Sequence, residues 1–328
     1  MGQKQILYVV IPCYNEEDAL KETSRRLEQK MNRLIACHRI GQDSRVLFVN
    51  DGSKDNTWQM IKMLHKETPL FTGVCLSRNR GHQNALLAGL LTAAEKADVT
   101  ISMDADLQDD LDALDAMLDA YEDGFDIVYG VRNNRESDTF FKRNTAQLFY
   151  RLMNALGGEL VYNHADFRLM SRRAVKALEE YREVNLFLRG IVPMIGYKST
   201  VVEYKRNPRV AGKSKYPLKK MLSFALEGIT SLSTRPMRML TWLGMMVFIL
   251  SLFMLVYIFV RHVTGHTVAG WSSVAVSVWA IGGLQLLGLG IIGEYIGKIY
   301  LEVKDRPRYI IEENLEEESS CRNEKNRV

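Results

Sequence analysis

Residues 99–109 of this 328-residue chain read VTISMDADLQD and are the most informative part of the sequence about its fold. Its first five residues form a short, uncharged run of the kind found in strands that are buried on both faces of a sheet. Asp104 and Asp106 follow at once. Two carboxylates at the end of a buried strand can share a divalent cation, because Mg²⁺ and Mn²⁺ prefer hard oxygen ligands. The alternative for an isolated triplet of this kind is a solvated turn.

Four further β-prone runs occupy residues 6–11, 46–49, 72–76 and 127–129. Helix-like segments separate these runs, and the alternation continues to about residue 130. Buried strands that alternate with helices predict a parallel sheet covered by helices on both faces. We therefore expect an α/β fold with a Rossmann-like, mostly parallel sheet.

Polar residues follow the predicted strands, and the carboxyl ends of parallel strands meet at one edge of a sheet, where ligands bind. The strand-end clusters are Tyr14-Asn15-Glu16, Asp51-Gly52-Ser53, Ser77-Arg78-Asn79 and Asp104-Ala105-Asp106. No GxGxxG follows the first strand and no GxxxxGK[ST] occurs, which argues against a dehydrogenase and a P-loop NTPase. The clusters therefore predict one binding site that belongs to neither of these two classes of protein.

The composition excludes several classes of protein. Hydrophobic residues make up 47% of the chain and charged residues 25%, which excludes a disordered chain and a membrane protein of many spans. A net charge of +4 is too small to indicate nucleic-acid binding. The four cysteines show no CxxC and no zinc-ligand spacing, so we expect free thiols in a reducing cytosol. The N-terminus does not read as a signal peptide.

Charge is distributed unevenly in the C-terminal third. Residues 205–238 contain nine Lys and Arg against one acid, Glu227, whereas Arg261 is the only charged residue between Arg238 and Glu294. Residues 239–260 would extend about 33 Å as a helix, enough to cross the hydrocarbon core. Residues 272–292 form a second predicted span, and a buried core helix is the alternative for each. Basic residues precede the first span and follow the second, so the positive-inside rule places both ends of this pair of spans in the cytoplasm.

These observations divide the chain into six parts. They are a catalytic domain, 1–215; a juxtamembrane amphipathic segment, 216–238; a first transmembrane helix, 239–260; an external loop, 261–271; a second transmembrane helix, 272–292; and a cytoplasmic tail, 293–328, disordered from residue 312. Residues 137–156 and 216–233 read as amphipathic helices that lie at the membrane interface or, alternatively, pack in the core. We expect a protein of the cell membrane with its catalytic domain in the cytoplasm.

Six ordered motifs resemble those of a known family. VIPCYNE at 10–16, VNDGS at 49–53 and MDADLQD at 103–109 resemble the signature of family 2 glycosyltransferases, which have the GT-A fold. DFRLM at 166–170, FLRG at 187–190 and RVAGKSKY at 209–216 resemble the polyprenyl-phosphate branch, which includes dolichol-phosphate mannose synthase and bacterial undecaprenyl-phosphate glucosyltransferases. The resemblance covers about residues 5–305 and includes two C-terminal spans.

The resemblance implies roles for individual residues. The nucleotide-sugar donor would be bound by Pro12, Tyr14, Glu16, Val49, Asp51, Asp104, Ala105, Asp106, Gln108, Arg132, Arg209 and Lys215. The implied ligands of Mg²⁺ or Mn²⁺ are Asp104, Asp106 and Gln108. Asp104, Asp106 and Asp166 are the implied catalytic residues, and the acceptor phosphate would be met by Asp166, Arg168 and Lys215.

Three of these assignments have alternatives. Arg135 could take the place of Arg132 beside the donor phosphates. Asp166 could be a structural carboxylate that pairs with Arg168. Residues 205–220 could be a basic patch on the membrane surface, although the flexible Gly212 between Arg209 and Lys215 favours a lid that closes over phosphates.

The sequence therefore predicts an inverting, metal-dependent enzyme. It would transfer a sugar, glucose or an N-acetylhexosamine, from a UDP-linked donor to undecaprenyl phosphate at the cytoplasmic face of the membrane, and we expect a homo-oligomer that binds no nucleic acid. A processive polysaccharide synthase is disfavoured because no QxxRW motif occurs and the spans are too few for a channel. A non-catalytic scaffold or transport subunit would not need Asp104 and Asp106, which are both present.

Overall fold

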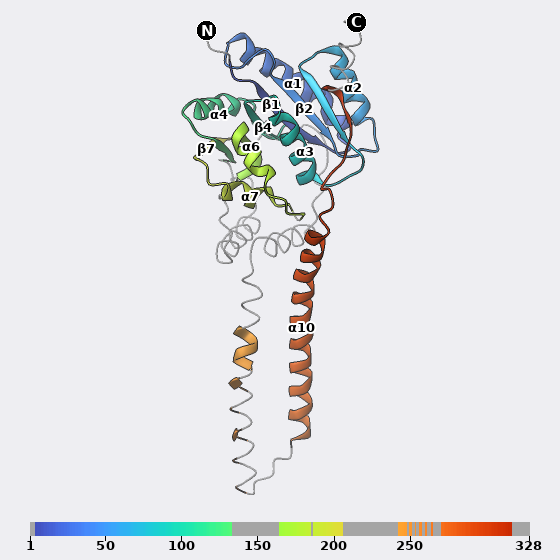
Figure 1. Ribbon diagram of the computed structural model, residues 1–328, viewed down its shortest axis with the longest axis vertical. Coiled ribbons are helices and arrows are strands. Elements are labelled where there is room, and N and C mark those ends of the chain that lie inside the picture. The colour runs from blue at the N-terminus through green and yellow to red at the C-terminus, as the bar shows by residue number, and fades with distance from the viewer. Residues whose placement is uncertain are drawn as a thin grey trace.

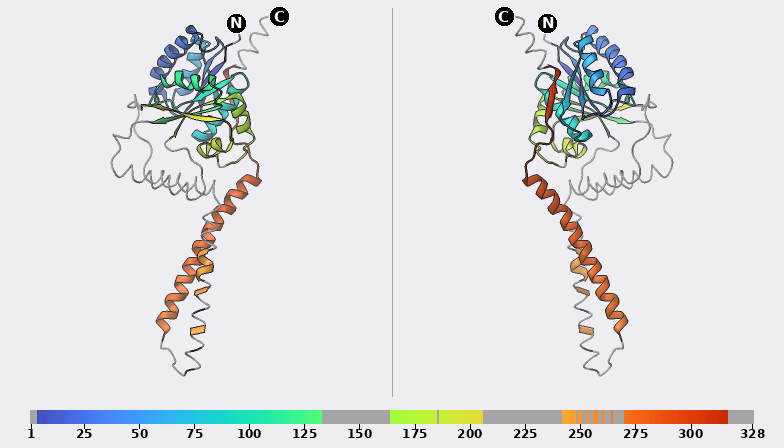
Figure 2. Two further views of the ribbon diagram at one scale, coloured as in Figure 1. Left: turned by 90° about the vertical axis from the view of Figure 1, so that its left-hand side faces the viewer. Right: turned by 90° about the vertical axis from the view of Figure 1, so that its right-hand side faces the viewer.

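The structure is a computed structural model with a sheet domain and a long helix, α10 (Trp271–Val303), that projects from it and has its C-terminal end beside the domain (Figures 1 and 2). It describes residues 4–132, 164–184, 186–205 and 270–316, together with 242–247 and single positions between 249 and 264. The predicted amphipathic helices at 137–156 and 216–233 lie outside the described residues.

One eight-stranded sheet forms the centre of the domain, with the strand order β7-β5-β6-β4-β1-β2-β3-β8. The strands are β1 (Leu7–Cys13), β2 (Arg45–Asn50), β3 (Phe71–Leu76), β4 (Val99–Ser102), β5 (Ile127–Arg132), β6 (His164–Ser171), β7 (Ser199–Tyr204) and β8 (Ile311–Asn314). The five strands expected from uncharged runs are all present as β1 to β5. Strands β4, β1, β2 and β3 pair in parallel, which confirms the expected parallel core.

The sheet is mixed because two strands run against their neighbours. Strand β6 is inserted between β4 and β5 and is antiparallel to both, and β8 is antiparallel to β3. Because β6 runs in the opposite direction, its first residues lie at the carboxyl edge of β4. Ser102 pairs with Arg168 in this register, so Asp166 comes beside the residues that follow β4.

Helices cover both faces of the sheet (Figure 1). They are α1 (Glu17–Ala36), α2 (Thr57–Glu67), α3 (His82–Ala94), α4 (Ala113–Glu122), α6 (Arg172–Glu179) and α7 (Leu188–Met194). In β1 alternate side chains enter different clusters, Val9 with α1, α2 and α4 on one face and Val10 with α3, α6 and α7 on the other. This alternation follows from the two-residue period of a strand, and it explains why both faces of β1 had to be apolar.

The tail does not become disordered at residue 312 as expected. Residues 311–314 form β8 on the edge of β3, and Leu315 is buried beneath it. The polar composition of this segment misled the prediction, because its backbone pairs with an edge strand and its acidic side chains find partners in the domain. Trp58 Nε1 donates a hydrogen bond of 2.8 Å to Glu313, for example.

Helix α10 extends beyond the predicted second span, which ended at residue 292. Its end is tied to the domain, since Glu302 accepts a hydrogen bond of 2.7 Å from the backbone N–H of Val184. Residues 242–247 are helical as well. None of the helices in the described part of the chain is both long enough and apolar enough to cross a membrane.

Candidate active site

The loops that follow β1 and β2 are joined by hydrogen bonds at the carboxyl edge of the sheet. The backbone N–H of Asn15 donates to Ser53 Oγ at 3.0 Å, and that of Glu16 donates to Thr57 Oγ1 at 2.9 Å. Tyr14 precedes them and is exposed. The two predicted nucleoside-binding segments therefore form one surface.

Two of the predicted donor-binding residues are part of the sheet itself. Pro12 pairs with Val49 in the parallel register of β1 and β2, and both are buried. The Val49 side chain packs in the cluster beneath α3, so its side chain faces the core. Only the backbone at these two positions can line a ligand site above the strand ends.

Asp51 has both carboxylate oxygens engaged by the loop that follows β3. The backbone N–H of Arg80 donates to Oδ1 at 2.7 Å, and that of Gly81 donates to Oδ2 at 2.9 Å. Burial raises the pKa of Asp51, and these backbone hydrogen bonds oppose the rise. Asp51, predicted to meet the base of the donor, therefore also fixes the start of α3.

The position next to Asp51, Gly52, has no room for a side chain. Its φ angle is +63°, in the region that favours glycine, and a Cβ atom there would lie 2.6 Å from the backbone nitrogen of Asn79. The ends of β2 and β3 can approach this closely only because residue 52 is glycine.

The DAD motif follows β4 and lies at the middle of the edge. Asp104 is 39% exposed at its side chain, and Asp106 Oδ1 accepts the backbone N–H of Gln108 at 3.2 Å. Ala105 is buried, and its carbonyl accepts a hydrogen bond of 2.7 Å from Thr23 Oγ1 of α1. The motif is therefore anchored by Ala105 while Asp104 reaches solvent.

Asp109 is a buried acid that the sequence analysis did not single out. Tyr204 donates a hydrogen bond of 2.5 Å to Asp109 Oδ1, and Asp109 Oδ2 is buried without a hydrogen-bond partner among the described residues. Burial, with the charges of Asp104 and Asp106, raises the pKa of Asp109 to about 6. The negative charges of this loop thus repel one another.

A divalent cation fits this electrostatic situation, because it would offset the repulsion among the carboxylates. Within the described residues, no three His, Cys, Asp or Glu side chains converge closely enough to hold a metal alone. Mg²⁺ usually takes one or two protein carboxylates and completes its shell with water and substrate phosphate oxygens. Asp104 and Asp106 supply that number.

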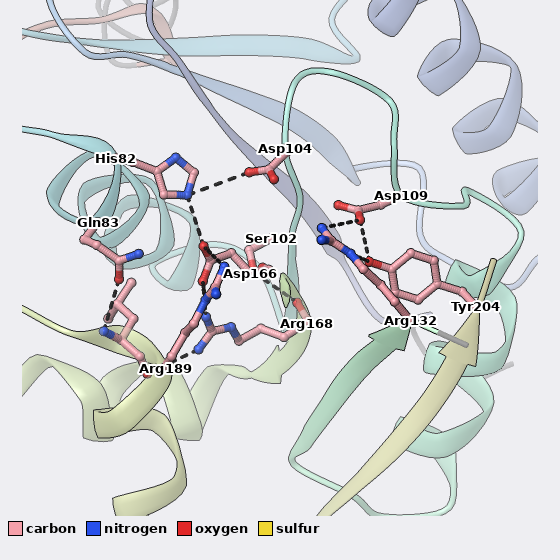
Figure 3. Close-up of polar contacts among 11 residues, drawn as sticks. His82, Gln83, Ser102, Asp104, Asp109, Arg132, Asp166, Arg168, Arg189 and Tyr204 are labelled. Carbon is pink, nitrogen blue, oxygen red and sulfur yellow. Dashed lines mark hydrogen bonds and ion pairs between the residues drawn. The ribbon is translucent and has the colours of Figure 1, made fainter. Parts of the chain in front are cut away.

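Arg132 lies at the end of β5, where it contacts the same acidic group. Its Nε donates a hydrogen bond of 3.1 Å to the hydroxyl of Tyr204, and its Nη2 lies 3.7 Å from Asp109 Oδ1 (Figure 3). Arg132, which the sequence analysis expected beside the donor phosphates, thus lies next to the acidic loop that follows β4. Tyr204, which no sequence motif indicated, positions the guanidinium group.

Asp166 lies at the start of β6, on the other side of Asp104 from Arg132 (Figure 3). Arg168 Nη2 donates to Oδ1 at 2.8 Å, and Arg189 donates through Nε to Oδ1 at 3.2 Å and through Nη2 to Oδ2 at 3.1 Å. Burial alone would raise the pKa of Asp166, but Arg189, His82 and Arg168 hold it well below its usual range. The pairing of Asp166 with Arg168, one of the two alternatives, is present.

His82 connects the two groups of acids. Its Nε2 lies 3.4 Å from Asp166 Oδ2 and 3.8 Å from Asp104 Oδ1 (Figure 3). Burial lowers the pKa of His82, but Asp166 and Asp104 outweigh that effect and raise it above its usual value. His82 and Arg189 are site residues that the sequence analysis did not assign. Only the FLRG motif could have indicated Arg189.

The structure therefore gathers Asp51, Asp104, Asp106, Arg132 and Asp166 along one edge of the sheet. Arg209, Lys215 and Arg135 lie outside the described residues. The three described cysteines are free thiols, as expected from their spacing: Cys13, Cys37 and Cys75.

Known proteins resemble this chain over most of its length. The uncharacterized glycosyltransferase YkoT of Bacillus subtilis (strain 168) is 55% identical over 316 residues, which are 96% of this chain and 94% of YkoT. The SfII prophage-derived bactoprenol glucosyl transferase of Shigella flexneri is 39% identical over 311 residues, which are 93% of this chain and 97% of that protein.

Among solved structures, glucosyl-3-phosphoglycerate synthase from Mycobacterium tuberculosis, crystallised with Mn²⁺, uridine diphosphate and phosphoglyceric acid, is 17% identical with a TM-score of 0.46. The match covers 70% of this chain and 77% of that one. Residues 8–179 match glycosyl transferase family 2. The chain is a glycosyltransferase and belongs to glycosyl transferase family 2.

Proposed function

We propose that this enzyme transfers glucose or an N-acetylhexosamine from a UDP-linked donor to the phosphate of a polyprenyl lipid, undecaprenyl phosphate. The observation that carries the proposal is the likeness of this chain, over almost the full length of both chains, to a bactoprenol glucosyl transferase. The site supports it as well, since a surface formed by the loops after β1 and β2 and an Asp166-centred cluster lie on opposite sides of Asp104.

The reaction is a single displacement. A phosphate oxygen of the lipid attacks the anomeric carbon, the bond from that carbon to the donor phosphate breaks, and the nucleoside diphosphate leaves with inversion at the carbon. A phosphate monoester has a second pKa of about 6, so the acceptor is already ionised at neutral pH and needs no general base. Asp166 supports this account, because its carboxylate is saturated by Arg168, Arg189 and His82.

The residues that would hold a divalent cation are Asp104 and Asp106, with Gln108 beside them. Bound there together with the donor diphosphate, Mg²⁺ or Mn²⁺ would neutralise the charge that develops on the leaving group. Arg132 is held 3.7 Å from Asp109, where it adds a positive charge on the same side. We propose that Arg209 and Lys215 form the lid that closes over the phosphates.

Attachment to the membrane belongs to the same proposal. We propose that 239–260 and 272–292 form a hairpin in the cell membrane, that 1–215 and 293–328 lie in the cytoplasm, and that 216–238 lies at the interface. Large apolar side chains exposed along α10 support this, because soluble surfaces rarely expose such a row. They include Val274, Val278, Ile281, Leu286 and Leu289. A homo-oligomer stays a prediction.

A donor screen tests the proposal. Membranes that contain the protein are supplied with undecaprenyl phosphate and with each labelled nucleotide-sugar in turn, and radioactivity in the lipid extract is counted. We expect one UDP-linked hexose or N-acetylhexosamine to label the lipid. Absence of label with every donor would overturn the proposal.

A further inference from the structure

Asp166 has no capacity left to bind a further donor or to accept a proton. Its Oδ1 accepts from Arg168 Nη2 and Arg189 Nε, and its Oδ2 accepts from Arg189 Nη2 and faces His82 Nε2 at 3.4 Å. A carboxylate offers about four lone-pair positions, and these contacts use them. An anion could not approach this carboxylate directly, so any acceptor phosphate must be met by its partners.

The turn that carries Arg189 is fixed to the rest of the site at three points. Gln83 Oε1 accepts the backbone N–H of Leu188 at 3.1 Å, Arg168 Nη1 donates to the Leu188 carbonyl at 3.4 Å, and Asp166 holds the Arg189 side chain (Figure 3). Gln83 belongs to the first turn of α3, next to His82. Strand β6, α3 and α7 therefore jointly determine where Arg189 points.

Two arginines face the single carboxylate of Asp166. Arg168 is 1% exposed and pairs with the buried Asp166 carboxylate, which is 8% exposed. Arg189 is 35% exposed and adds a second positive charge nearer to solvent. Asp166 accepts from Nε and Nη2 of Arg189, so a phosphate would be met by the other edge of the guanidinium group, formed by Nη1 and Nη2.

Arg189 is in α7 and is held against Asp166 of β6, which places it on the side of β4 away from the nucleoside segments. The loops after β1 and β2 lie on one side of β4, whereas β6 lies on the other. His82 spans the distance from the Asp166 group to Asp104, which marks the reaction centre. A phosphate at Arg189 would therefore approach the centre from the side opposite to the nucleoside segments, as in-line displacement requires.

We propose that Arg189 binds the phosphate of the lipid acceptor, and that Asp166 is the positioning residue that holds its guanidinium group. This inference rests on the proposed function, since it names the residue of that site which recognises the acceptor. Asp166 acts through Arg189 and does not itself touch the phosphate.

Binding of a short prenyl monophosphate tests the inference independently of catalysis. The full-length protein in detergent is titrated with farnesyl phosphate, with farnesol and with UDP plus Mn²⁺. We expect Arg189→Gln to weaken binding of farnesyl phosphate about tenfold to a hundredfold, as loss of a charge-assisted hydrogen bond would. Binding of UDP should change less than twofold, as should that of farnesol.

Two further variants test the positioning role of Asp166. Arg189→Lys keeps the charge but loses the paired N–H donors of the guanidinium group, so we expect an intermediate loss of affinity for farnesyl phosphate. This variant also guards against a fold defect in Arg189→Gln. Asp166→Asn should weaken farnesyl phosphate binding to a similar extent, and the double variant should be no worse than the more affected single variant. Arg173→Gln is the matched control, because Arg173 forms the same bidentate contact with Asp126 away from the site.

The binding experiments can contradict the inference in three ways and can also separate it from the proposed function. Equal affinity of the unmodified protein for farnesyl phosphate and farnesol, or unchanged affinity in both Arg189 variants, would overturn the inference. A parallel loss of UDP binding would assign Arg189 to the donor phosphates and also overturn it. Arg189-dependent binding of farnesyl phosphate in a protein that transfers no sugar would support the inference and contradict the proposed function alone.

Discussion

The hydroxyl of Tyr8 donates a hydrogen bond of 2.7 Å to Glu316, a residue 308 positions further along the chain. Glu316 also accepts a 2.8 Å hydrogen bond from Lys96 Nζ. Burial and Glu316 together raise the pKa of Tyr8. The segment that follows α10 is thus bound to β1 and to Lys96, which lies just after α3, and these contacts hold the end of α10 against the catalytic domain.

Removing this contact should destabilise the domain. Glu316→Ala leaves the buried Tyr8 hydroxyl without its acceptor, which costs about 1–3 kcal/mol of unfolding free energy. Denaturant unfolding followed by tryptophan fluorescence measures the loss. Glu312→Ala, at an exposed position in β8 just before Glu316, is the control and should cost less than about 0.5 kcal/mol. Equal losses would mean that the tail is not anchored through Glu316.

Gly52 provides a second test of stability. Ala at this position must adopt a positive φ angle, at a cost of about 1–2 kcal/mol, and its Cβ would also collide with the backbone of Asn79. Gly124→Ala is the matched control, since Gly124 has a φ of +85° but nothing within 4 Å of its Cβ. We expect Gly52→Ala to lose at least about 1 kcal/mol more than Gly124→Ala. Similar losses would show that the two loops do not pack this closely.

Asp104 and Asp106 should be indispensable for transfer but not for folding. Asp104→Asn and Asp106→Asn each remove a carboxylate ligand, and we expect sugar transfer to fall by about a hundredfold or more, or at least 2.7 kcal/mol of transition-state stabilisation. The melting temperature should change little, because Asp104 is partly exposed. EDTA should abolish activity and added Mn²⁺ should restore it. Asp123→Asn, on the surface after α4, is the control.

Full activity in EDTA would contradict metal dependence. Restoration by Mn²⁺ but not by Mg²⁺, or the reverse, would identify the ion that the enzyme uses.

The proposed hairpin predicts a labelling pattern in intact cells. In a background in which Cys37 and Cys321 are replaced by Ser, His266→Cys should react with an impermeant thiol reagent, because 261–271 would lie outside. Glu312→Cys should not react until the cells are lysed, since β8 pairs with the catalytic domain. Labelling of Glu312→Cys but not of His266→Cys would place the active site outside the cell.

The sequence was informative where structure depends on local composition. The cores of strands β1 to β5 are uncharged runs, and β1 to β4 are each followed by a polar cluster that the structure places at the common edge. Strand β6 was not predicted because it contains Asp166 and Arg168, which look like surface residues until their mutual pairing is known. Strand β8 was missed because its partner, β3, lies more than 230 residues earlier in the chain.

The same distinction holds within the site. Asp104 and Asp106 were predicted because their spacing and position at a strand end carry the information. The contact of His82 with Asp104 and Asp166 depends on α3 and β6 meeting beside β4, and no local pattern indicates it. Asp109 looked like one more acid of the motif until Tyr204 and Arg132 surrounded it.

The most direct test of the proposed reaction is identification of its product. Purified enzyme, labelled UDP-sugar and Mn²⁺ are incubated with undecaprenyl phosphate, with undecaprenol or without lipid, and the extracts are analysed by mass spectrometry. We predict a glycosyl undecaprenyl phosphate of inverted anomeric configuration, formed only from the phosphorylated lipid, together with an equal amount of UDP. Transfer to undecaprenol at the same rate, or a product of retained configuration, would contradict the account.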